Sequence, residues 1–353
     1  MRPAHHSSWL DLGKGGGVPE VPSEVWLVLA GLFGAVVGSF LNVVIWRMPR
    51  NESIAFPGSH CPRCNHELSA WENVPVLSWL LLRAKCRKCR MPISARYPAV
   101  ELLNATLWVA CVAHFGPGPD AVAYCLFSSA MIAAFAIDWE HYIIPDEVNA
   151  FALFVGVARD LYGAWAGEPA HALLMGWMPR SVAAGILCAS AFVGVQILGR
   201  ALFRQDAMGD GDVKLARAIG AVLPLQLAGV SFLFAIAVGA LVGTAMLAVA
   251  ARSGRNQPAA EADELPIPEP TPWPVLLRCG LIYMTYLDML PARANAALVR
   301  WSGAEDLAEG EDDDFRPGPT HIPFGPYMVL GAALSVAFGQ AAVDWYLTTI
   351  GMK

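Results

Sequence analysis

The stretch VWLVLAGLFGAVVGSFLNVVIW, residues 25–46, is 22 residues long and contains no charged side chain. A helix needs about 20 mainly apolar residues to cross a bilayer, so this stretch predicts a membrane-spanning helix. Four more long uncharged runs follow it, at residues 121–137, 181–198, 227–251 and 327–343. A large soluble enzyme with buried core helices would rarely contain five such runs, so we predict an all-α polytopic membrane protein.

The composition of the whole chain agrees with this fold class. Of the 353 residues, 56% are hydrophobic and only 15% are charged, whereas charged residues make up about 25% of a typical soluble domain. At the N-terminus, Arg2 and Lys14 are spread over a polar lead, and the apolar run behind them is longer than the core of a signal peptide. We therefore predict that residues 25–46 are a retained first helix and that residues 1–24 are a periplasmic lead.

The orientation in the membrane follows from one basic loop, residues 47–97. It has three acidic residues and nine basic ones, which are Arg47, Arg50, Arg63, Arg83, Lys85, Arg87, Lys88, Arg90 and Arg96. Loops rich in Lys and Arg stay on the cytoplasmic side. After this loop, we count seven further spans. They begin near residues 98, 120, 147, 181, 213, 227 and 324. With the first helix, the prediction is about eight spans in all. Residues 98–251 form the transmembrane core, and residues 323–353 contain the last helix.

Residues 252–322 differ from the rest of the chain. Pro, Ala, Glu and Asp dominate there, and an acidic cluster occupies residues 311–314, so we predict a solvated cytoplasmic insertion. Within it, residues 273–290 are apolar but contain Arg278 and Asp288. We favour an amphipathic helix at the membrane interface over a ninth span.

Four of the eight cysteines form two pairs in the basic loop. The pairs are Cys61-Pro-Arg-Cys64 and Cys86-Arg-Lys-Cys89, with 21 residues between them. Two C-x-x-C turns at this separation can place four thiolates around one zinc ion, and a reducing cytosol disfavours disulfides. His60 and His66 are alternative ligands that two complete cysteine pairs make unnecessary. We predict a small zinc-binding loop domain with four cysteine ligands and a structural metal, and we interpret the other four cysteines as core residues.

Two aspartates lie where apolar runs meet the predicted cytoplasmic side. Asp138 follows Ala136-Ile137, and Asp212 lies in the segment Met208-Gly-Asp-Gly-Asp-Val-Lys214. An ionisable residue at the edge of a span is costly and is usually functional. Asp212 could instead be a helix N-cap, and Asp138 could merely end a span. Taken together, they can form a carboxyl pair that hydrolyses a peptide without a metal, one ionised and the other protonated. Gly209 and Gly211 would allow a close backbone approach.

Six separate stretches, in this order, resemble the type IV prepilin peptidases, also called leader peptidase/N-methyltransferases. They are residues 38–47 (GSFLNVVIWR), 71–75 (WENVP) between the cysteine pairs, 97–101 (YPAVE), 138–146, 209–214 (GDGDVK) and 323–326 (PFGP). The resemblance covers most of the chain outside residues 1–24 and 252–322. One residue departs from the family pattern, because Ala84 stands where the family usually has Gly.

The resemblance implies a GxGD-type aspartic peptidase of the bacterial inner membrane, with its active site at the cytoplasmic face and Asp138 and Asp212 as the catalytic pair. Asp146 and Lys214 would support them, and Asp210 would be dispensable. Prepilins of type IV pili or pseudopilins of type II secretion would be the substrates. The resemblance also implies transfer of a methyl group from S-adenosylmethionine to the new N-terminal amine, although Ala84 weighs against this activity. No glycine-rich fingerprint locates the residues that bind this cofactor.

Two alternatives remain open on the sequence alone. The aspartates could line an ion path in a transporter, although such sites usually lie near the middle of the membrane. The chain could also be a docking platform for a secretion machine. Besides its substrates, we predict contact with membrane lipid and no nucleic-acid partner, and the oligomeric state is left open.

Overall fold

The computed structural model describes residues 21–168, 171, 174, 176–204, 208–252, 271–290, 292–304 and 323–349. The described part is helical, with three isolated β-bridges and no strand. Its main helices are α1 (Ser23–Arg47), α2 (Leu77–Leu81), α3 (Arg96–Phe115), α4 (Pro119–His141), α5 (Asp146–Trp165), α6 (Arg180–Phe203), α7 (Asp210–Val222), α8 (Leu225–Arg252), α9 (Trp273–Met284), α10 (Ala292–Ser302), α12 (Gly325–Leu334) and α13 (Gln340–Thr349). The polytopic all-α fold is confirmed.

Each of the eight predicted spans is helical in the structure, but only six helical segments among the described residues are long and apolar enough to cross a membrane. The two that fall short are α5, whose 20 residues include Asp146, Glu147, Arg159 and Asp160, and α7. With 13 residues, α7 is about 20 Å long, less than the roughly 30 Å of a bilayer core. It therefore lies inside the bundle, packed on α5 and α6.

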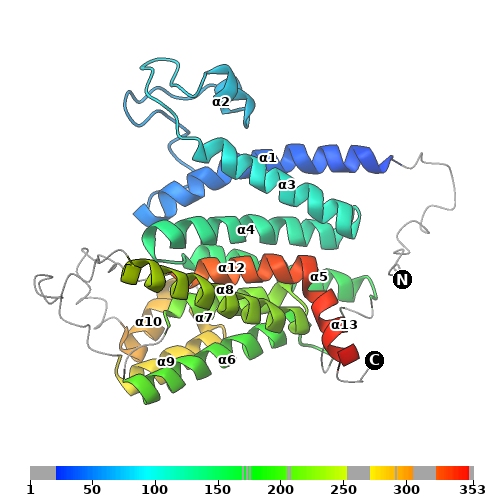
Figure 1. Cartoon of the computed structure of the whole chain (residues 1–353), viewed down its shortest axis with the longest axis vertical. Helices are drawn as coiled ribbons and strands as arrows, with labels where there is room; N and C mark the ends of the chain where they lie inside the picture. Colours follow the sequence, from blue (N-terminus) through cyan, green and yellow to red (C-terminus); the bar gives the residue numbers. More distant parts are fainter. Residues whose placement is uncertain are drawn as a thin grey trace, which may run out of the picture.

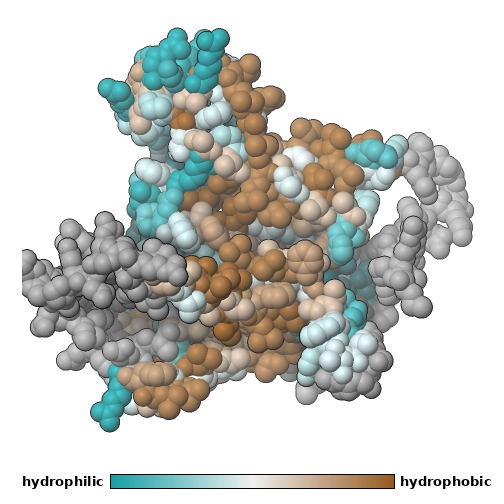
Figure 2. Space-filling view, viewed as in Figure 1, coloured by the Kyte–Doolittle hydropathy of each residue, from teal (hydrophilic) through white to brown (hydrophobic). Residues whose placement is uncertain are grey.

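The long helices lie side by side, and the loop between α1 and α3 projects beyond them (Figure 1). Large apolar side chains, such as Leu32, Phe154 and Leu241, are exposed on the helices. Figure 2 shows this apolar surface over the helices and a hydrophilic surface on the projecting loop. Such a division suits a bundle in lipid with a loop in water.

Close packing of α1 on α3 depends on a GxxxG pattern, Gly34 to Gly38. A Cβ atom at Gly38 would lie only 2.7 Å from the Cα of Glu101. The side chain of Asn104 donates a hydrogen bond to the carbonyl of Gly34 at 2.7 Å. Small residues let membrane helices approach closely, and here they fix where Glu101 lies at the start of α3.

The insertion contains a packed part. Within residues 252–322, the structure describes residues 271–290 and 292–304, which form α9, a 3₁₀ turn (Leu287–Met289) and α10. The buried face of α9, including Leu276, Cys279 and Ile282, lies against α6. The acidic cluster at residues 311–314 and the lead at residues 1–20 lie outside the described residues.

Candidate active site and metal centre

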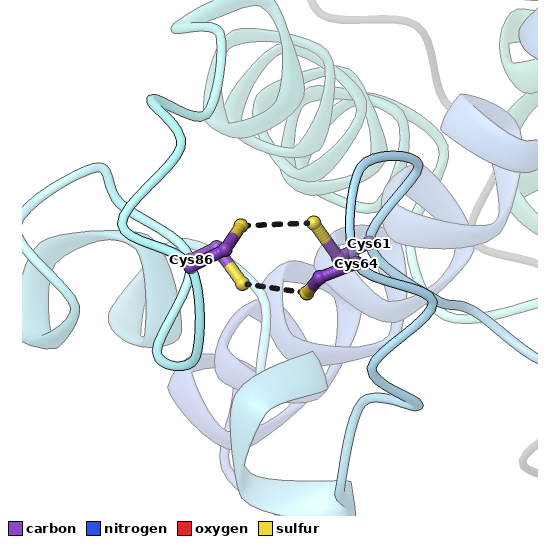
Figure 3. Close-up of side chains that lie close together, drawn as sticks. Cys61, Cys64 and Cys86 are labelled. Carbon is purple, nitrogen blue, oxygen red and sulfur yellow. Dashed lines mark hydrogen bonds between the residues drawn. The ribbon is translucent and has the colours of Figure 1, made fainter.

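The four loop cysteines form one cluster (Figure 3). Their sulfur atoms all lie within 4.8 Å of one another. The Sγ atoms of Cys61 and Cys89 are 3.7 Å apart, and those of Cys64 and Cys86 are 4.0 Å apart. Four thiolates at about 2.3 Å from a tetrahedral zinc ion would be about 3.8 Å from each other. The donor set and its spacing therefore fit zinc, as the sequence predicted.

Both cysteine pairs adopt the same local turn. The N–H of Asn65 donates to the carbonyl of Cys61, and the N–H of Arg90 donates to that of Cys86. Asn65 and Arg90 have φ values of 51° and 58°, so in each turn the chain reverses through a left-handed residue directly after the second cysteine. Each turn is closed by an antiparallel bridge, His60 with Glu67 and Lys85 with Pro92. This local repeat presents two sulfurs from each turn to a common centre.

Backbone N–H groups favour the thiolate, the form that binds zinc, at the first cysteine of each pair. Burial of the Cys61 sulfur opposes ionisation, but the N–H groups of Cys64 and Arg63 point at it and lower its pKa to about 6. The N–H of Cys89, working against burial, lowers the pKa of Cys86 as well. At Cys89 the N–H of Met91 acts in the same sense, but burial and the neighbouring sulfurs outweigh it and raise the pKa of this thiol to about 11. The two histidines beside the cluster have other partners. The imidazole Nε2 of His66 is 3.3 Å from the carboxylate of Glu72, and Nδ1 of His60 is 3.0 Å from the carbonyl of Gly58.

The position that departs from the family pattern has an unusual backbone. Ala84 has φ of 57°, in the left-handed region that glycine adopts without a steric penalty. Its N–H donates to the carbonyl of Trp79 at 2.8 Å, and its own carbonyl accepts from Ile93 at 2.7 Å. Alanine therefore occupies a conformation suited to glycine, and these two hydrogen bonds hold it there.

Asp138 lies in the last turn of α4 and is 5% exposed. Its carboxylate accepts a hydrogen bond from the N–H of Gly325 at the start of α12. A Cβ atom at position 325 would collide with this carboxylate and with Ile144. The predicted start of the last helix thus touches the predicted catalytic aspartate, and glycine is the residue that leaves room for it.

Asp212 faces Asp138 from α7, and the two carboxyl groups are near enough for their charges to interact. The N-cap of α7 is Gly209, whose carbonyl accepts the N–H of Asp212 at 3.2 Å. The helix therefore starts earlier than the sequence suggested, and Asp212 is not the N-cap. Gly211 lies against Ile144, with a would-be Cβ 3.4 Å from the Cβ of Ile144. Gly209, Gly211 and Asp212 thus line the same small region as Asp138.

Asp146 and Lys214 bind each other. The Nζ of Lys214 is 2.7 and 2.9 Å from the two carboxylate oxygens of Asp146. This pair joins the start of α5 to the first turns of α7. Lys214 therefore orients a neighbouring charge.

Sequence reasoning missed a second anchor of α7, which comes from the insertion. The guanidinium of Arg217, 1% exposed, donates to both carboxylate oxygens of Asp288, at 2.7 and 2.6 Å, and to the carbonyl of Tyr283 at 2.8 Å. The hydroxyl of Tyr283 donates to Asp210 at 2.7 Å. A signal existed, because Asp288 is a charge inside an apolar stretch and Arg217 is a charge inside a short apolar helix.

Comparisons with known proteins show the family to which this chain belongs. Residues 32–115 match the bacterial peptidase A24 N-terminal domain, and residues 125–244 match the type IV leader peptidase family. A prepilin leader peptidase/N-methyltransferase of Myxococcus xanthus is 36% identical over 89% of this chain and 90% of its own length. The chain belongs to the type IV leader peptidase family.

Other relatives of this leader peptidase family member support the assignment. A Burkholderia pseudomallei prepilin leader peptidase/N-methyltransferase is 34% identical over 63% of this chain and 77% of its own length. An Escherichia coli type 4 prepilin-like proteins leader peptide-processing enzyme is 35% identical over 58% of this chain and 80% of its own length. No solved structure gives a significant match. The first family segment contains the cysteine cluster, and the second contains both Asp138 and Asp212.

Proposed function

We propose that this chain removes the basic leader from type IV prepilins or type II secretion pseudopilins and then methylates the new N-terminal amine with S-adenosylmethionine. The observation that carries the peptidase half is the approach of Asp138 and Asp212 in a chain of the leader peptidase family. Relatives named as N-methyltransferases support the second half.

In the proposed cleavage step, Asp138 and Asp212 act as a proton-sharing pair. The ionised carboxyl group takes a proton from water, and the protonated one donates to the carbonyl oxygen of the scissile peptide. Two carboxylates this close cannot both stay ionised easily, so their ionisations separate. The N–H of Gly325 is bonded to Asp138 and would hold that side chain in place. Gly209, Gly211, Asp146 and Lys214 position the α7 side of the pair.

The basic loop supports an orientation in the bacterial inner membrane with the aspartate pair at the cytoplasmic face. A substrate would present its basic leader in the cytosol and its apolar helix in the membrane. The four cysteines would hold a structural zinc ion, because all four positions of a tetrahedral sphere are filled by thiolates and none is left for a catalytic water. The loop is too small for a sizeable core, so zinc would be its main source of order.

Cleavage of a prepilin by the purified full-length protein tests this proposal. Wild type should remove the leader, and with S-adenosylmethionine present the mature product should gain the mass of one methyl group. Asp138→Asn and Asp212→Asn should each lower cleavage by about 10⁴-fold or more, because the pair acts as a unit. Glu147→Gln, an exposed acid in the same region, is the matched control and should cleave normally.

Three results would each contradict a different part of the proposal. Normal cleavage by both aspartate variants would exclude the aspartic mechanism. No cleavage by wild type, together with ion flux in liposomes that depends on Asp138 and Asp212, would favour the transporter. A cleaved product of unmethylated mass would leave the peptidase and remove the methyltransferase.

A further inference from the structure

A cavity lies beside the zinc loop, away from the aspartate pair. Its volume is about 810 Å³, within the range of small-molecule sites. It lies where the last turns of α1, the first turns of α3 and the loop meet, and Glu140 of α4 closes one side. Nothing in the proposed cleavage step uses it.

Three of the stretches that the sequence singled out meet at this cavity. Residues 38–47 contribute Ser39, Asn42 and Trp46, residues 71–75 contribute Glu72 and Asn73, and residues 97–101 contribute Tyr97 and Glu101. The other three stretches belong to the aspartate site, and of these only residues 138–146 also reach the cavity, through Glu140. The stretches therefore gather at two places that share the end of α4, and the gathering of three of them at a cavity indicates a second functional site.

A buried carboxylate in the wall makes the cavity suited to a cation. Glu101 is 7% exposed and accepts hydrogen bonds from the N–H of Val76, at 2.7 Å, and from Ser39. Of the other acids in the wall, Glu140 pairs with Arg96 and Glu72 with His66, and Glu52 is exposed to solvent. No basic partner of Glu101 is found in the described part of the chain. Burying an unpaired charge is costly, so a cationic ligand would stabilise this site.

Asn42 provides a second unpaired group. Its amide NH₂ donates to the carbonyls of Gly38, at 3.3 Å, and Tyr97, at 3.1 Å, which fixes the orientation of the amide. Its Oδ1 is buried without a hydrogen-bond partner. Buried acceptors are nearly always satisfied, so a ligand with an N–H or O–H group is expected here.

The cavity wall also includes the rings of Trp46, Trp79 and Tyr97. The indole N–H of Trp79 donates to the carbonyl of Ile93 at 3.1 Å, which holds that ring in place. Aromatic faces bind both planar bases and cations. Together with Glu101 and Asn42, they complement a ligand that combines a planar base, hydrogen-bond donors and a positive charge.

We propose that this cavity binds S-adenosylmethionine, with its sulfonium toward Glu101 and a donor group at Asn42 Oδ1. This inference rests on the proposed methyltransferase activity and locates the binding site of its methyl donor in the cavity. Transfer requires that the substrate ammonium first lose a proton to solvent. The nitrogen lone pair then forms the bond to the methyl carbon, and the sulfur keeps the electron pair of the broken C–S bond as a neutral thioether.

The cavity and the aspartate pair share the end of α4. Asp138 and Glu140 are two residues apart, which is about 200° around a helix and about 3 Å along it. Asp138 therefore faces α12, while Glu140 faces the cavity and pairs with Arg96. An amine released by cleavage beside Asp138 would need to pass only around the end of one helix to reach the methyl donor.

Binding measurements on the full-length, zinc-loaded protein test the assignment. Wild type should bind S-adenosylmethionine more tightly than the neutral S-adenosylhomocysteine. Glu101→Gln keeps a carbonyl oxygen for the Val76 N–H and removes the charge. It should weaken binding of the sulfonium at least tenfold, about 1.4 kcal/mol, and abolish the preference over the neutral ligand. Glu67→Gln, an exposed acid of the same loop outside the cavity, should bind as wild type does.

Photocrosslinking of S-adenosylmethionine to wild type gives a readout that needs no variant. Labelled peptides should contain Trp46, Trp79 or Tyr97. Unchanged binding and methylation by Glu101→Gln, or labels only on peptides outside the cavity, would overturn this location and leave the proposed function intact. A wild-type protein that cleaves prepilin but neither binds nor uses S-adenosylmethionine would instead refute the methyltransferase itself.

Discussion

The cysteine cluster and the aspartate pair are built in opposite ways. The four cysteines lie within one loop, and each pair uses the same short turn with a left-handed residue behind it. The aspartate site combines the end of α4, the start of α7 and the start of α12. The first site is therefore a local structure that a metal can stabilise, whereas the second exists only when the whole bundle is packed.

Loss of one zinc ligand should give the largest effect, and the effect should stay local. We expect Cys86→Ser to lower bound zinc from one ion per chain to well below one, because structural zinc in small domains contributes about 10–16 kcal/mol of folding free energy. Metal analysis and hydrogen exchange of residues 51–95 measure this. The helices should keep their protection, since helix packing in lipid holds them. If α4 and α7 lost as much protection from hydrogen exchange as the loop, the zinc loop would not be a local structure separate from the bundle.

Breaking the ion pair between Arg217 of α7 and Asp288 of the insertion should affect the aspartate site. Asp288→Ala leaves the buried guanidinium of Arg217 without its carboxylate, and breaking a buried pair in this way costs about 3–5 kcal/mol. We expect a lower unfolding temperature in detergent and slower prepilin cleavage, with zinc content unchanged. The double variant Arg217→Met with Asp288→Leu should recover part of the stability. A fully stable, fully active Asp288→Ala protein would show that the insertion does not hold α7.

The sequence predicted the local site more completely than the distributed one. Spacing alone placed four thiols together, because the turns that bring them there are a few residues long. For the aspartates, counting spans could place Asp138 and Asp212 at one membrane face, but it could not show that Gly325 binds Asp138. Nor could it show that Asp288 binds Arg217, which lies 71 positions earlier in the chain. Such contacts depend on how helices pack, and a one-dimensional pattern does not contain that information.

The ion pair between Asp146 and Lys214 should matter less than Asp288. The Asp146 side chain is 62% exposed, and exposed pairs are worth about 0–1 kcal/mol because solvent screens them. We expect Asp146→Asn to reduce cleavage by a few fold at most, since asparagine keeps one oxygen toward Lys214. Kinetics of leader removal measure the effect, with Asp138→Asn as the reference for complete loss. Complete loss in Asp146→Asn and normal cleavage in Asp138→Asn would mean that Asp146 is the true partner of Asp212.

The smallest expected effect is a gain in stability at Ala84. A left-handed conformation costs an L-residue about 1–2 kcal/mol, and glycine avoids that strain at an entropic cost of about 0.4–1 kcal/mol in the unfolded chain. Ala84→Gly should therefore stabilise the loop by up to about 1.6 kcal/mol, seen as slower zinc loss to a chelator. Ala95 has φ of −65°, so the matched variant Ala95→Gly should lose stability instead. If both variants accelerate zinc loss, the backbone at Ala84 is not strained, and the departure from the family glycine is neutral. If only Ala84→Gly slows zinc loss, the backbone at position 84 has the left-handed conformation that glycine prefers, although alanine stands there. In that case we expect the loop to keep its shape and methyl transfer to be retained.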